Sequence, residues 1–384
     1  MINVGIVTAH HYPRLGGMEY VTHFMADYLN QIDGINVSVA CNTLRGIPKS
    51  FEYPYACYRS KSLSVLTPWL FRLNQLKMIK REQINILHGP MLHGGGNWAK
   101  SLSEQLNLPF VAHSHGSDVQ IVKEIDYGAL LNLEKRKIIK DVIKKADKLI
   151  AVSSINKQNI IDLGAVPERV EVIHNGIQIN EINAIPFENL RLKWGIKEDD
   201  FTIITVGRNR PVKRMELLFE ALKKLKDFKK IKCVCVGPKE NLGQLTIKYN
   251  IQDKVILTGS IPKEFDINNK PPYPDLINAY RNANIYISTS YVESFGSATA
   301  DALACGIPVV IGKKHGVKDI VLNEQTGWIM EKEAPSSLAE LILELYEKQS
   351  KLKEQSAFIK QSVAHLTWEE IAMQMTNIYK TIMY

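Results

Sequence analysis

The chain has 384 residues, more than the roughly 250–300 that one hydrophobic core usually supports, so its length predicts two domains. Hydrophobic residues make up 45% and charged residues 23% of the sequence, as in soluble globular proteins, and no apolar run approaches the roughly 20 residues that cross a bilayer. The formal net charge of +8 predicts anionic partners, although charge alone does not distinguish phosphates, anionic lipid and nucleic acid.

The apolar run at the start of the chain is interpreted as a strand at residues 3–8 rather than as a signal peptide. It lacks the basic segment and the small-residue cleavage site that a signal peptide has. Short apolar runs then alternate with segments of helical apolar spacing, which is typical of parallel sheets wound with helices. The other predicted strands of the first half are 35–40, 84–88, 110–113, 148–152 and 170–174, and those of the second half are 201–206, 231–236, 254–257, 285–288 and 308–311.

Residues 175–200, rich in Asn, Glu and Pro, predict a linker with a short helix, and residues 366–383 have helical apolar spacing. We therefore predict an α/β protein of two Rossmann-like, doubly wound domains, at 1–180 and 181–365. We also predict a C-terminal helix at 366–384. The sequence leaves open on which domain it packs, and the N-terminal domain is one option. Neither domain has a Gly-x-Gly-x-x-Gly after its first strand, which disfavours a dehydrogenase.

Two clusters at predicted strand ends suit phosphate binding. Gly16-Gly17 opens the helical segment after the first strand, where free amides and the helix dipole favour an anion, although a simple turn is the competing explanation. Residues 207–214 place Arg208, Lys213 and two further arginines directly after the strand that ends at Val206. Open α/β sheets bind ligands at the carboxyl ends of their strands, so this cluster predicts an anion site; a solvated basic helix start is the alternative.

A third cluster combines two acids with a helix start. Glu293 and Asp301 lie eight positions apart after another predicted strand, and the amides of Phe295, Gly296 and Ser297 lie at the beginning of the following helix. The carboxylates suit sugar hydroxyls and the amides suit a diphosphate. Helix capping by the two acids is the alternative explanation.

Histidines end a strand of the first half, in the run from His113 to Asp118. His-x-His spacing suits a metal, but the chain has no Asp-x-Asp and no Cys-x-x-Cys among its five cysteines, so no metal site is predicted. We predict instead that His115 makes a polar contact with substrate, a buried core histidine being the alternative.

These clusters, in this order and spacing, resemble the retaining glycosyltransferase family four, whose GT-B fold consists of two Rossmann-like domains that face each other across a cleft. The resemblance covers nearly the whole chain. It rests on Gly16-Gly17-Met18-Glu19, His115-Gly116-Ser117-Asp118, residues 172–177, Gly207-Arg208 with Lys213, residues 293–301 and Thr326-Gly327.

The resemblance implies that Arg208 and Lys213 grip the diphosphate of a nucleotide-sugar donor and that Glu293 touches the transferred sugar. It also implies that Asp301 holds the ribose hydroxyls and that His115 lies at the reacting sugar. The amides of Phe295, Gly296 and Ser297 would contact the donor, and Gly16 and Gly17 would close the site from the acceptor side. The family usually has Glu at the position of Asp301, so this chain has a shorter carboxylate there.

The expected activity is that of a metal-independent hexosyltransferase or N-acetylhexosaminyltransferase without a cofactor, acting in surface polysaccharide or glycoconjugate biosynthesis. A UDP-sugar is the favoured donor and a GDP-sugar the other option; the acceptor is a glycan or a lipid-linked oligosaccharide. The alternatives left open are a nucleotide-sugar epimerase or phosphorylase on the same fold and a non-catalytic partner subunit. No nucleic-acid partner is expected, because no recognisable nucleic-acid module is present.

Residues 59–83, from Arg59 to Gln83, carry six basic side chains and one acid between apolar ones that include Trp69 and Phe71. A basic amphipathic helix of this kind suits an anionic membrane surface, and ordinary packing of an outer helix is the alternative. The expected location is cytoplasmic, with a peripheral position on the inner face of the cell membrane as an option.

Overall fold

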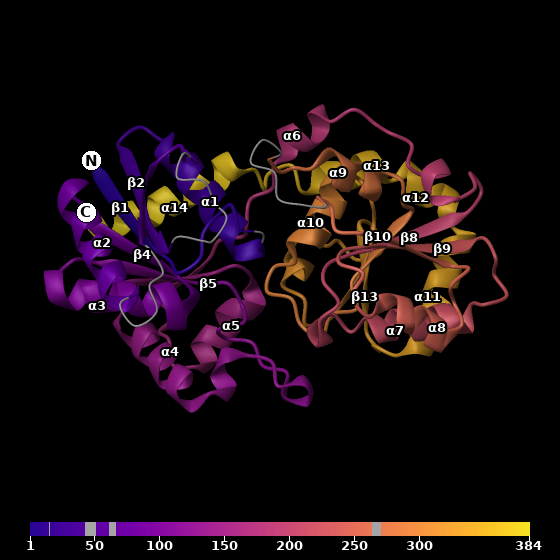
Figure 1. Cartoon of the computed structure of the whole chain (residues 1–384), viewed down its shortest axis with the longest axis horizontal. Coiled ribbons are helices and arrows are strands. Elements are labelled where there is room, and N and C mark those ends of the chain that lie inside the picture. Colours follow the sequence, from indigo (N-terminus) through magenta and orange to yellow (C-terminus); the bar gives the residue numbers. More distant parts are fainter. Residues whose placement is uncertain (15, 43–50, 61–66, 263–269) are drawn as a thin grey trace. The chain divides into compact units, whose positions relative to one another are not determined.

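The computed structural model describes residues 1–14, 16–42, 51–60, 67–262 and 270–384. Within them the chain divides into two compact units (Figure 1). Unit 1 comprises Met1–Gly176 and Leu366–Tyr384, and unit 2 comprises Ile177–His365. Each unit is built around one parallel sheet, which confirms the predicted α/β class.

Unit 1 has a seven-stranded parallel sheet in the order β3-β2-β1-β4-β5-β6-β7. Its central strands are buried on both faces, as in sheets covered by helices on each side. The strands are β1 (Ile2–Val7), β2 (Ile35–Asn42), β3 (Ala56–Ser60), β4 (Ile86–Pro90), β5 (Phe110–Ser114), β6 (Lys148–Ala151) and β7 (Val170–Val172).

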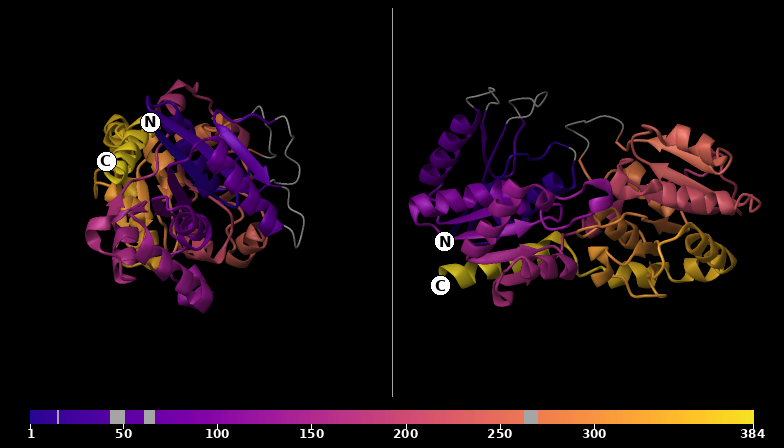
Figure 2. Two further views of the ribbon diagram at one scale, coloured as in Figure 1. Left: turned by 90° about the vertical axis from the view of Figure 1, so that its left-hand side faces the viewer. Right: turned by 90° about the horizontal axis from the view of Figure 1, so that it is seen from below.

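Helices cover both faces of this sheet, and each face has its own core (Figure 2). The helices are α1 (Gly17–Asn30), α2 (Thr67–Arg81), α3 (Asn97–Leu106), α4 (Leu133–Lys145), α5 (Ser154–Asp162) and α14 (Trp368–Met383). One core joins α1 and α14 to side chains such as Val4 and Ile6, and the other joins α2, α3 and α4 to side chains such as Val7 and Leu87.

Unit 2 repeats this arrangement with a six-stranded parallel sheet in the order β10-β9-β8-β11-β12-β13. Its strands are β8 (Phe201–Val206), β9 (Ile231–Val236), β10 (Val255–Gly259), β11 (Ile285–Ile287), β12 (Val309–Gly312) and β13 (Gly327–Met330). Its helices are α6 (Ile179–Ala184), α7 (Met215–Lys224), α8 (Leu242–Tyr249), α9 (Pro274–Arg281), α10 (Ser297–Ala304), α11 (Pro335–Glu347), α12 (Gln349–Glu354) and α13 (Ser356–Ser362).

The C-terminal helix α14 packs on α1 in unit 1. Trp368, Ile371, Met375 and Tyr379 form its buried face, because a spacing of three or four residues returns to the same side of a helix. Thr367 caps its start by accepting a hydrogen bond from the Glu370 amide at 3.3 Å. None of the helices built from described residues combines the length and the apolar character that a membrane span requires.

All eleven strands predicted from the sequence are present, with ends shifted by up to two residues. The strands β3 and β13, which the sequence analysis did not predict, lie at the edges of their sheets. β3 mixes polar and apolar residues, and the apolar run of β13, at 328–330, is too short to stand out as a strand.

Candidate active site

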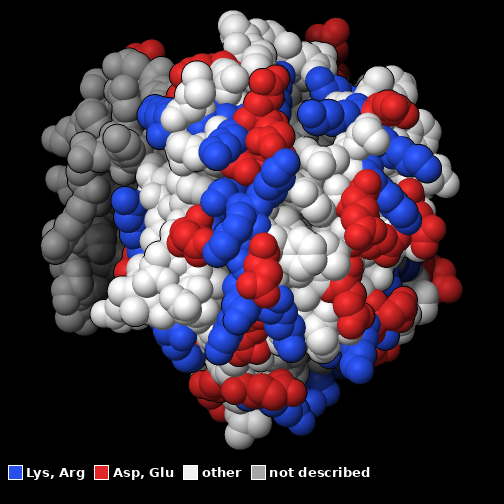
Figure 3. Space-filling model, turned by 90° about the vertical axis from the view of Figure 1, so that its right-hand side faces the viewer, with Lys and Arg blue, Asp and Glu red and all other residues white. Residues whose placement is uncertain are grey.

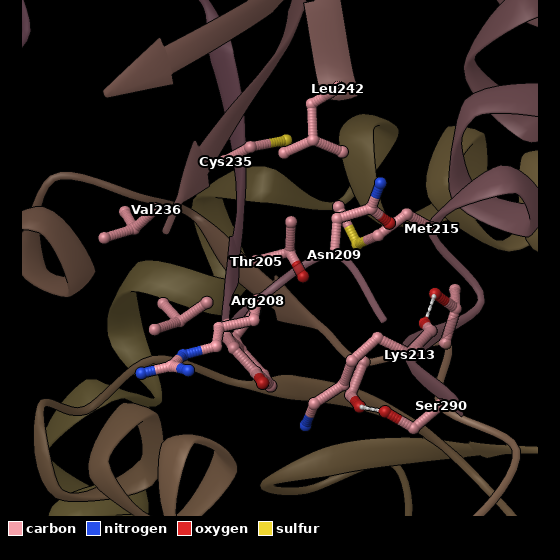
Figure 4. Close-up of a pocket in the computed structure, with 14 residues that line it drawn as sticks. Thr205, Arg208, Asn209, Lys213, Met215, Cys235, Val236, Leu242 and Ser290 are labelled. Carbon is pink, nitrogen blue, oxygen red and sulfur yellow. Dashed lines mark hydrogen bonds between the residues drawn. The ribbon is translucent and has the colours of Figure 1, made fainter. Parts of the chain in front are cut away.

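A pocket in unit 2 opens at the carboxyl ends of β8, β9 and β11 (Figure 4). Its polar wall includes Arg208, Lys213 and Ser290, and its apolar wall includes Cys235 and Leu242. The apolar pair lies at the end of the pocket away from Lys213 and Ser290. A wall with cations on one side and apolar atoms on the other offers contacts to a ligand with both an anionic and an apolar part.

The two cationic side chains come from the segment that follows β8. A 3₁₀ helix at Pro211–Lys213 has proline in its first turn, where the missing N–H costs nothing, and α7 begins two residues after it. Arg208 is exposed, and its side chain has no hydrogen bond or ion pair within the described ranges. Lys213 is half-buried, and its Nζ lies 2.5 Å from Glu293 Oε1.

Glu293 is held as a carboxylate. Its Oε1 accepts hydrogen bonds from Lys213 Nζ and, at 2.7 Å, from Ser290 Oγ. Burial alone would raise the pKa of Glu293, but the charge of Lys213 and these hydrogen bonds outweigh it and leave that pKa below its ordinary value. The structure therefore brings together two of the predicted site residues as an ion pair beside the pocket, with Arg208 in the pocket wall.

The loop after β11 is fastened to the turn that carries Lys213. Thr289 Oγ1 donates to the carbonyls of Lys213 and Arg214, both at 3.0 Å, and the Tyr291 amide donates to the Val212 carbonyl at 2.9 Å. These bonds fix the loop of Glu293 relative to the cationic turn, so the ion pair rests on a preorganised backbone.

The helix start predicted near Glu293 is also present. Gly296 precedes α10 with a φ of +90°, a conformation that glycine adopts without strain, and exposed Ser297 begins the helix. The first amides of any helix lack partners within it, so this end favours an anion. The Phe295 side chain, in contrast, is buried in the core.

Asp301 faces a different environment from Glu293. It lies on α10 near Tyr280 and Cys305, and it does not line the pocket of Arg208 and Lys213. Burial and the charge of Asp301 raise the pKa values of Tyr280 and Cys305. Burial raises the pKa of Asp301 itself to about 7.

In unit 1, Gly16 and Gly17 lie where β1 leads into α1, as predicted. A side chain at Gly16 would meet the Glu19 carboxylate, since a Cβ there would lie 2.3 Å from Glu19 Oε2. Glu19 also pairs with Arg14 at 3.5 Å. The start of α1 thus carries a carboxylate of its own in its first turn.

His115 belongs to a row of three histidines: His88 lies in β4, His113 in β5, and His115 directly after β5. The ring centroids of His88 and His113 are 5.4 Å apart, and those of His113 and His115 are 4.1 Å apart. Burial lowers the pKa of His115 to about 4, although the charge of Asp118 opposes this, so the imidazole is neutral at neutral pH. His88 Nδ1 contacts the Tyr379 hydroxyl at 2.8 Å, which joins the row to α14.

Asp118, part of the family motif, has an anchoring position. Its buried carboxylate accepts hydrogen bonds from the amides of Leu92 and Gly116 and from Ser114 Oγ, each at 2.9 Å. The contact with Leu92 ties this loop to a π-helix at Met91–Gly96, a rare element that is often found at functional sites.

Sequence reasoning missed Ser290 and His315 of unit 2. Ser290 bonds Glu293, and His315 Nε2 lies 2.8 Å from the Ser290 carbonyl oxygen. No spacing pattern marks either residue, because they meet only through the packing of separate loops. Within the described part of the chain, no three His, Cys, Asp or Glu side chains are grouped so that they could hold a metal ion.

Family models match both halves of the chain. The model described as Glycosyltransferase Family 4 matches residues 15–181, and the model described as Glycosyl transferases group 1 matches residues 186–363. Among curated proteins, D-inositol 3-phosphate glycosyltransferase 1 of Catenulispora acidiphila is 27% identical over 247 residues, which are 62% of this chain and 58% of that protein. An uncharacterized glycosyltransferase of Methanocaldococcus jannaschii is 23% identical over 79% of this chain and 78% of that protein. The chain spans little more than half the length of the first curated relatives it matches.

Solved structures share the fold over the full length. Sucrose-phosphate synthase from Thermosynechococcus elongatus has a TM-score of 0.83 at 19% identity, covering 100% of this chain and 99% of that one. Anabaena HepE in complex with UDP has a TM-score of 0.75 at 17% identity, covering 99% of this chain and 100% of that one. These likenesses confirm the predicted fold class, and the family models confirm the resemblance found in the sequence. The chain belongs to the group 1 glycosyltransferases of family four and has the GT-B fold.

Proposed function

We propose that this chain is a retaining glycosyltransferase that moves a hexosyl or N-acetylhexosaminyl group from a nucleotide diphosphate-sugar to a glycan or lipid-linked acceptor. The observation that carries the proposal is the pocket at the strand ends of unit 2, where Arg208 and Lys213 lie together and Lys213 contacts Glu293. Arg208 and Lys213 both offer N–H donors to phosphate oxygens, and the Arg208 charge has no acid paired with it among the described residues.

The charges of the reaction explain these residues. When the bond between the anomeric carbon and the diphosphate oxygen breaks, negative charge develops on the leaving group and positive charge on the sugar. Arg208, Lys213 and the amides at Gly296 and Ser297 would stabilise the leaving group, the task that a metal ion performs in other transferases. On this basis we propose a metal-independent reaction.

Retention of configuration needs no protein base in this scheme. The acceptor oxygen bonds to the anomeric carbon on the face that the diphosphate leaves, and the acceptor proton passes to the departing phosphate oxygen. Glu293, kept ionised by Lys213, would orient the donor sugar, and Asp301 would hold the ribose. We place His115 at the reacting sugar, where a neutral imidazole donates one hydrogen bond and accepts another. Gly16 and Gly17 would approach from the acceptor side.

UDP is the favoured nucleotide. One HepE structure contains UDP and another contains UDP-glucose, which supports a uridine donor here, with a GDP-sugar as the alternative.

The outer face of α2 is the observation that supports a lipid-linked acceptor in this proposal. Trp69 and Leu73, one turn apart, are 61% and 43% exposed, and Lys77 continues the same face, while Phe71 and Met78 pack inward. Residues 61–66 of the predicted membrane segment lie outside the described residues.

The proposal predicts a selective loss of transfer in two variants. Arg208→Ala and Lys213→Ala should each lower kcat by about 10²–10³-fold at saturating donor, because each removes a charge that stabilises the leaving group. The measurement is the rate of nucleotide diphosphate release with a panel of nucleotide-sugars and acceptors, after thermal-shift screening for the nucleotide that stabilises the protein.

Arg210→Ala is the matched control, since Arg210 is exposed in the same turn but does not line the pocket. Its kcat should remain close to that of the parent chain. Near-normal turnover in both Arg208→Ala and Lys213→Ala would refute the proposal, and release of a free epimer from donor alone would favour an epimerase.

A further inference from the structure

His315 is a fully buried histidine in the loop that follows β12. It belongs to none of the motifs recognised in the sequence, and it lies outside the pocket wall. Its Nε2 is 2.8 Å from the Ser290 carbonyl oxygen. A carbonyl only accepts, so Nε2 carries the proton and donates it.

Ser290 connects this histidine to the ion pair. Its backbone carbonyl accepts from His315, and its hydroxyl donates to Glu293 Oε1 at 2.7 Å, the same oxygen that Lys213 Nζ contacts at 2.5 Å. Two hydrogen bonds, joined by the covalent bonds of Ser290, therefore connect His315 to Glu293, and the ion pair connects Glu293 to Lys213. Each residue fixes the position of the next.

The backbone of the same loop fixes the other end of the segment. The Gly316 amide donates to the Glu293 carbonyl at 2.8 Å, and the Glu293 amide donates to the Lys314 carbonyl at 3.3 Å. With the imidazole on Ser290, the loop after β12 holds both Ser290 and Glu293, the first and last residues of this segment. Without the imidazole, the Ser290 carbonyl would lose this donor, and the Ser290 end would keep the bonds to the Lys213 turn and a longer contact from the Ser288 hydroxyl at 3.3 Å.

The charge state of His315 fits a donor in this place. Burial lowers its pKa, while Glu293 and Glu333 oppose the shift and Lys213 adds to it. The neutral ring thus donates from Nε2 without placing a second positive charge beside Lys213. Its Nδ1 is buried and has no hydrogen-bond partner among the described residues.

We propose that His315 is a positioning residue for the donor site: through Ser290 and Glu293 it sets the place of the Lys213 ammonium that faces the diphosphate. The inference rests on the proposed function, because it assigns Lys213 to the diphosphate. Misplacing a charged group by about 1 Å is enough to cost on the order of 10²-fold in rate.

The test begins with four chains in two assays, the parent, His315→Ala, His315→Gln and the control His365→Ala, and adds Ser290→Ala and its double variant with His315→Ala. UDP affinity is measured by calorimetry, and kcat and donor KM by initial rates. In His315→Ala, UDP binding should weaken by roughly 10-fold and kcat fall by roughly 10–100-fold. In His315→Gln both should return to within a few-fold of the parent, because the glutamine Nε2 offers an N–H at nearly the same distance from the backbone.

His365→Ala removes an exposed histidine and should match the parent in both assays. Melting temperatures measured in parallel identify any variant that fails to fold. If His315→Ala does not fold, the comparison of His315→Gln with Ser290→Ala, which breaks the connection to Glu293 at the hydroxyl, still decides: parent-like binding in Ser290→Ala refutes the inference.

A double-mutant cycle gives the sharpest readout. Ser290→Ala and His315→Ala act on the same carboxylate, so the double variant should lose less than the product of the single losses. Independent, multiplicative losses, or a His315→Gln variant as impaired as His315→Ala, would overturn the inference. A parent chain that binds no nucleotide diphosphate would refute the proposed function instead, and a parent that binds UDP without transfer still tests His315 through affinity.

Discussion

The two acids of the donor motif show how neighbours set the charge of a side chain. Both Glu293 and Asp301 are shielded from water, which raises the pKa of a carboxyl. Glu293 has Lys213 against it and stays ionised, whereas Asp301 has no such cation and its pKa rises to about 7. Near neutral pH the first is therefore an anion, whereas the pKa of the second lies close to the pH of the solution.

Asp301 should therefore make stability depend on pH. Its pKa is higher in the folded chain, at about 7, than in the unfolded chain, at 3.8. The folded state holds the extra proton between these values, so Asp301 lowers the free energy of unfolding as the pH rises from about 4 to about 7. Asp301→Asn removes this pH-dependent loss of stability. The melting temperature of the variant should exceed that of the parent by roughly a few degrees at pH 8 and by less at pH 5.

Asp227→Asn, which changes an exposed acid of the same unit, is the control and should show a small difference that does not vary with pH. The assignment would be wrong if the gap between Asp301→Asn and the parent were the same at pH 5 and pH 8. Scanning calorimetry or a dye-based melt at both pH values is sufficient.

For single residues, the sequence predicted the charged side chains of the candidate site but not the contacts that position them. Arg208, Lys213 and Glu293 were found because they follow strands, and parallel strands end at one edge of a sheet. Ser290 and His315 are separated by 25 positions and meet through a backbone carbonyl. Because every residue type has a backbone carbonyl, no sequence pattern predicts that contact.

Among the elements, the π-helix at Met91–Gly96 shows how closely two backbones pack in unit 1. A Cβ on Gly95 would lie 2.3 Å from the Val7 carbonyl oxygen and 2.5 Å from that of Pro90. A Cβ on Gly94, one residue earlier, would lie 3.7 Å from its nearest neighbour, Met91 Cβ. Only one of these adjacent glycines is therefore required by space.

This contrast predicts opposite outcomes for two substitutions in one element. Gly95→Ala should lower the free energy of unfolding by about 2 kcal/mol or more, because the new methyl group meets backbone that cannot turn away. Gly94→Ala should be neutral or slightly stabilising, since alanine reduces the freedom of the unfolded chain. Urea unfolding of both variants measures the difference, and equal losses would contradict the packing described here.

The inner strands and the α14 helix were predictable because their apolar residues repeat with the period of the element. The edge strand β3 was not, since its residues are mixed in polarity and only Ser60 is buried. The π-helix was also missed, because three consecutive glycines suggest a turn; in the structure they end a helix that packs against β4 and β5.

At the scale of the whole molecule, the net charge is +8. On the face shown in Figure 3, Lys and Arg side chains are interspersed with Asp and Glu. Exposed pairs such as Lys230 with Asp199, 2.7 Å apart, contribute little to stability in water. The outer side of α2 differs, because there apolar and basic side chains are exposed together.

We expect this side of α2 to bind anionic membranes. In vesicle flotation, the parent chain should float with anionic vesicles and remain below with neutral ones, and added salt should weaken the binding. The double variant Trp69→Ala with Leu73→Ala should float less. Phe358→Ala, which removes an exposed aromatic ring from α13 of unit 2, should behave like the parent. Binding that ignores lipid charge would contradict a membrane role.

Because unit 1 is assembled from two separate stretches of chain, the order of synthesis differs from the order in which the units can be completed. The core on one face of its sheet includes Trp368, Ile371 and Met375, and these residues leave the ribosome only after all of unit 2. Unit 2 is one continuous stretch and can close as it emerges. The nascent first half must meanwhile keep an uncovered apolar face out of contact with other chains, and that interval is where chaperones would be needed most.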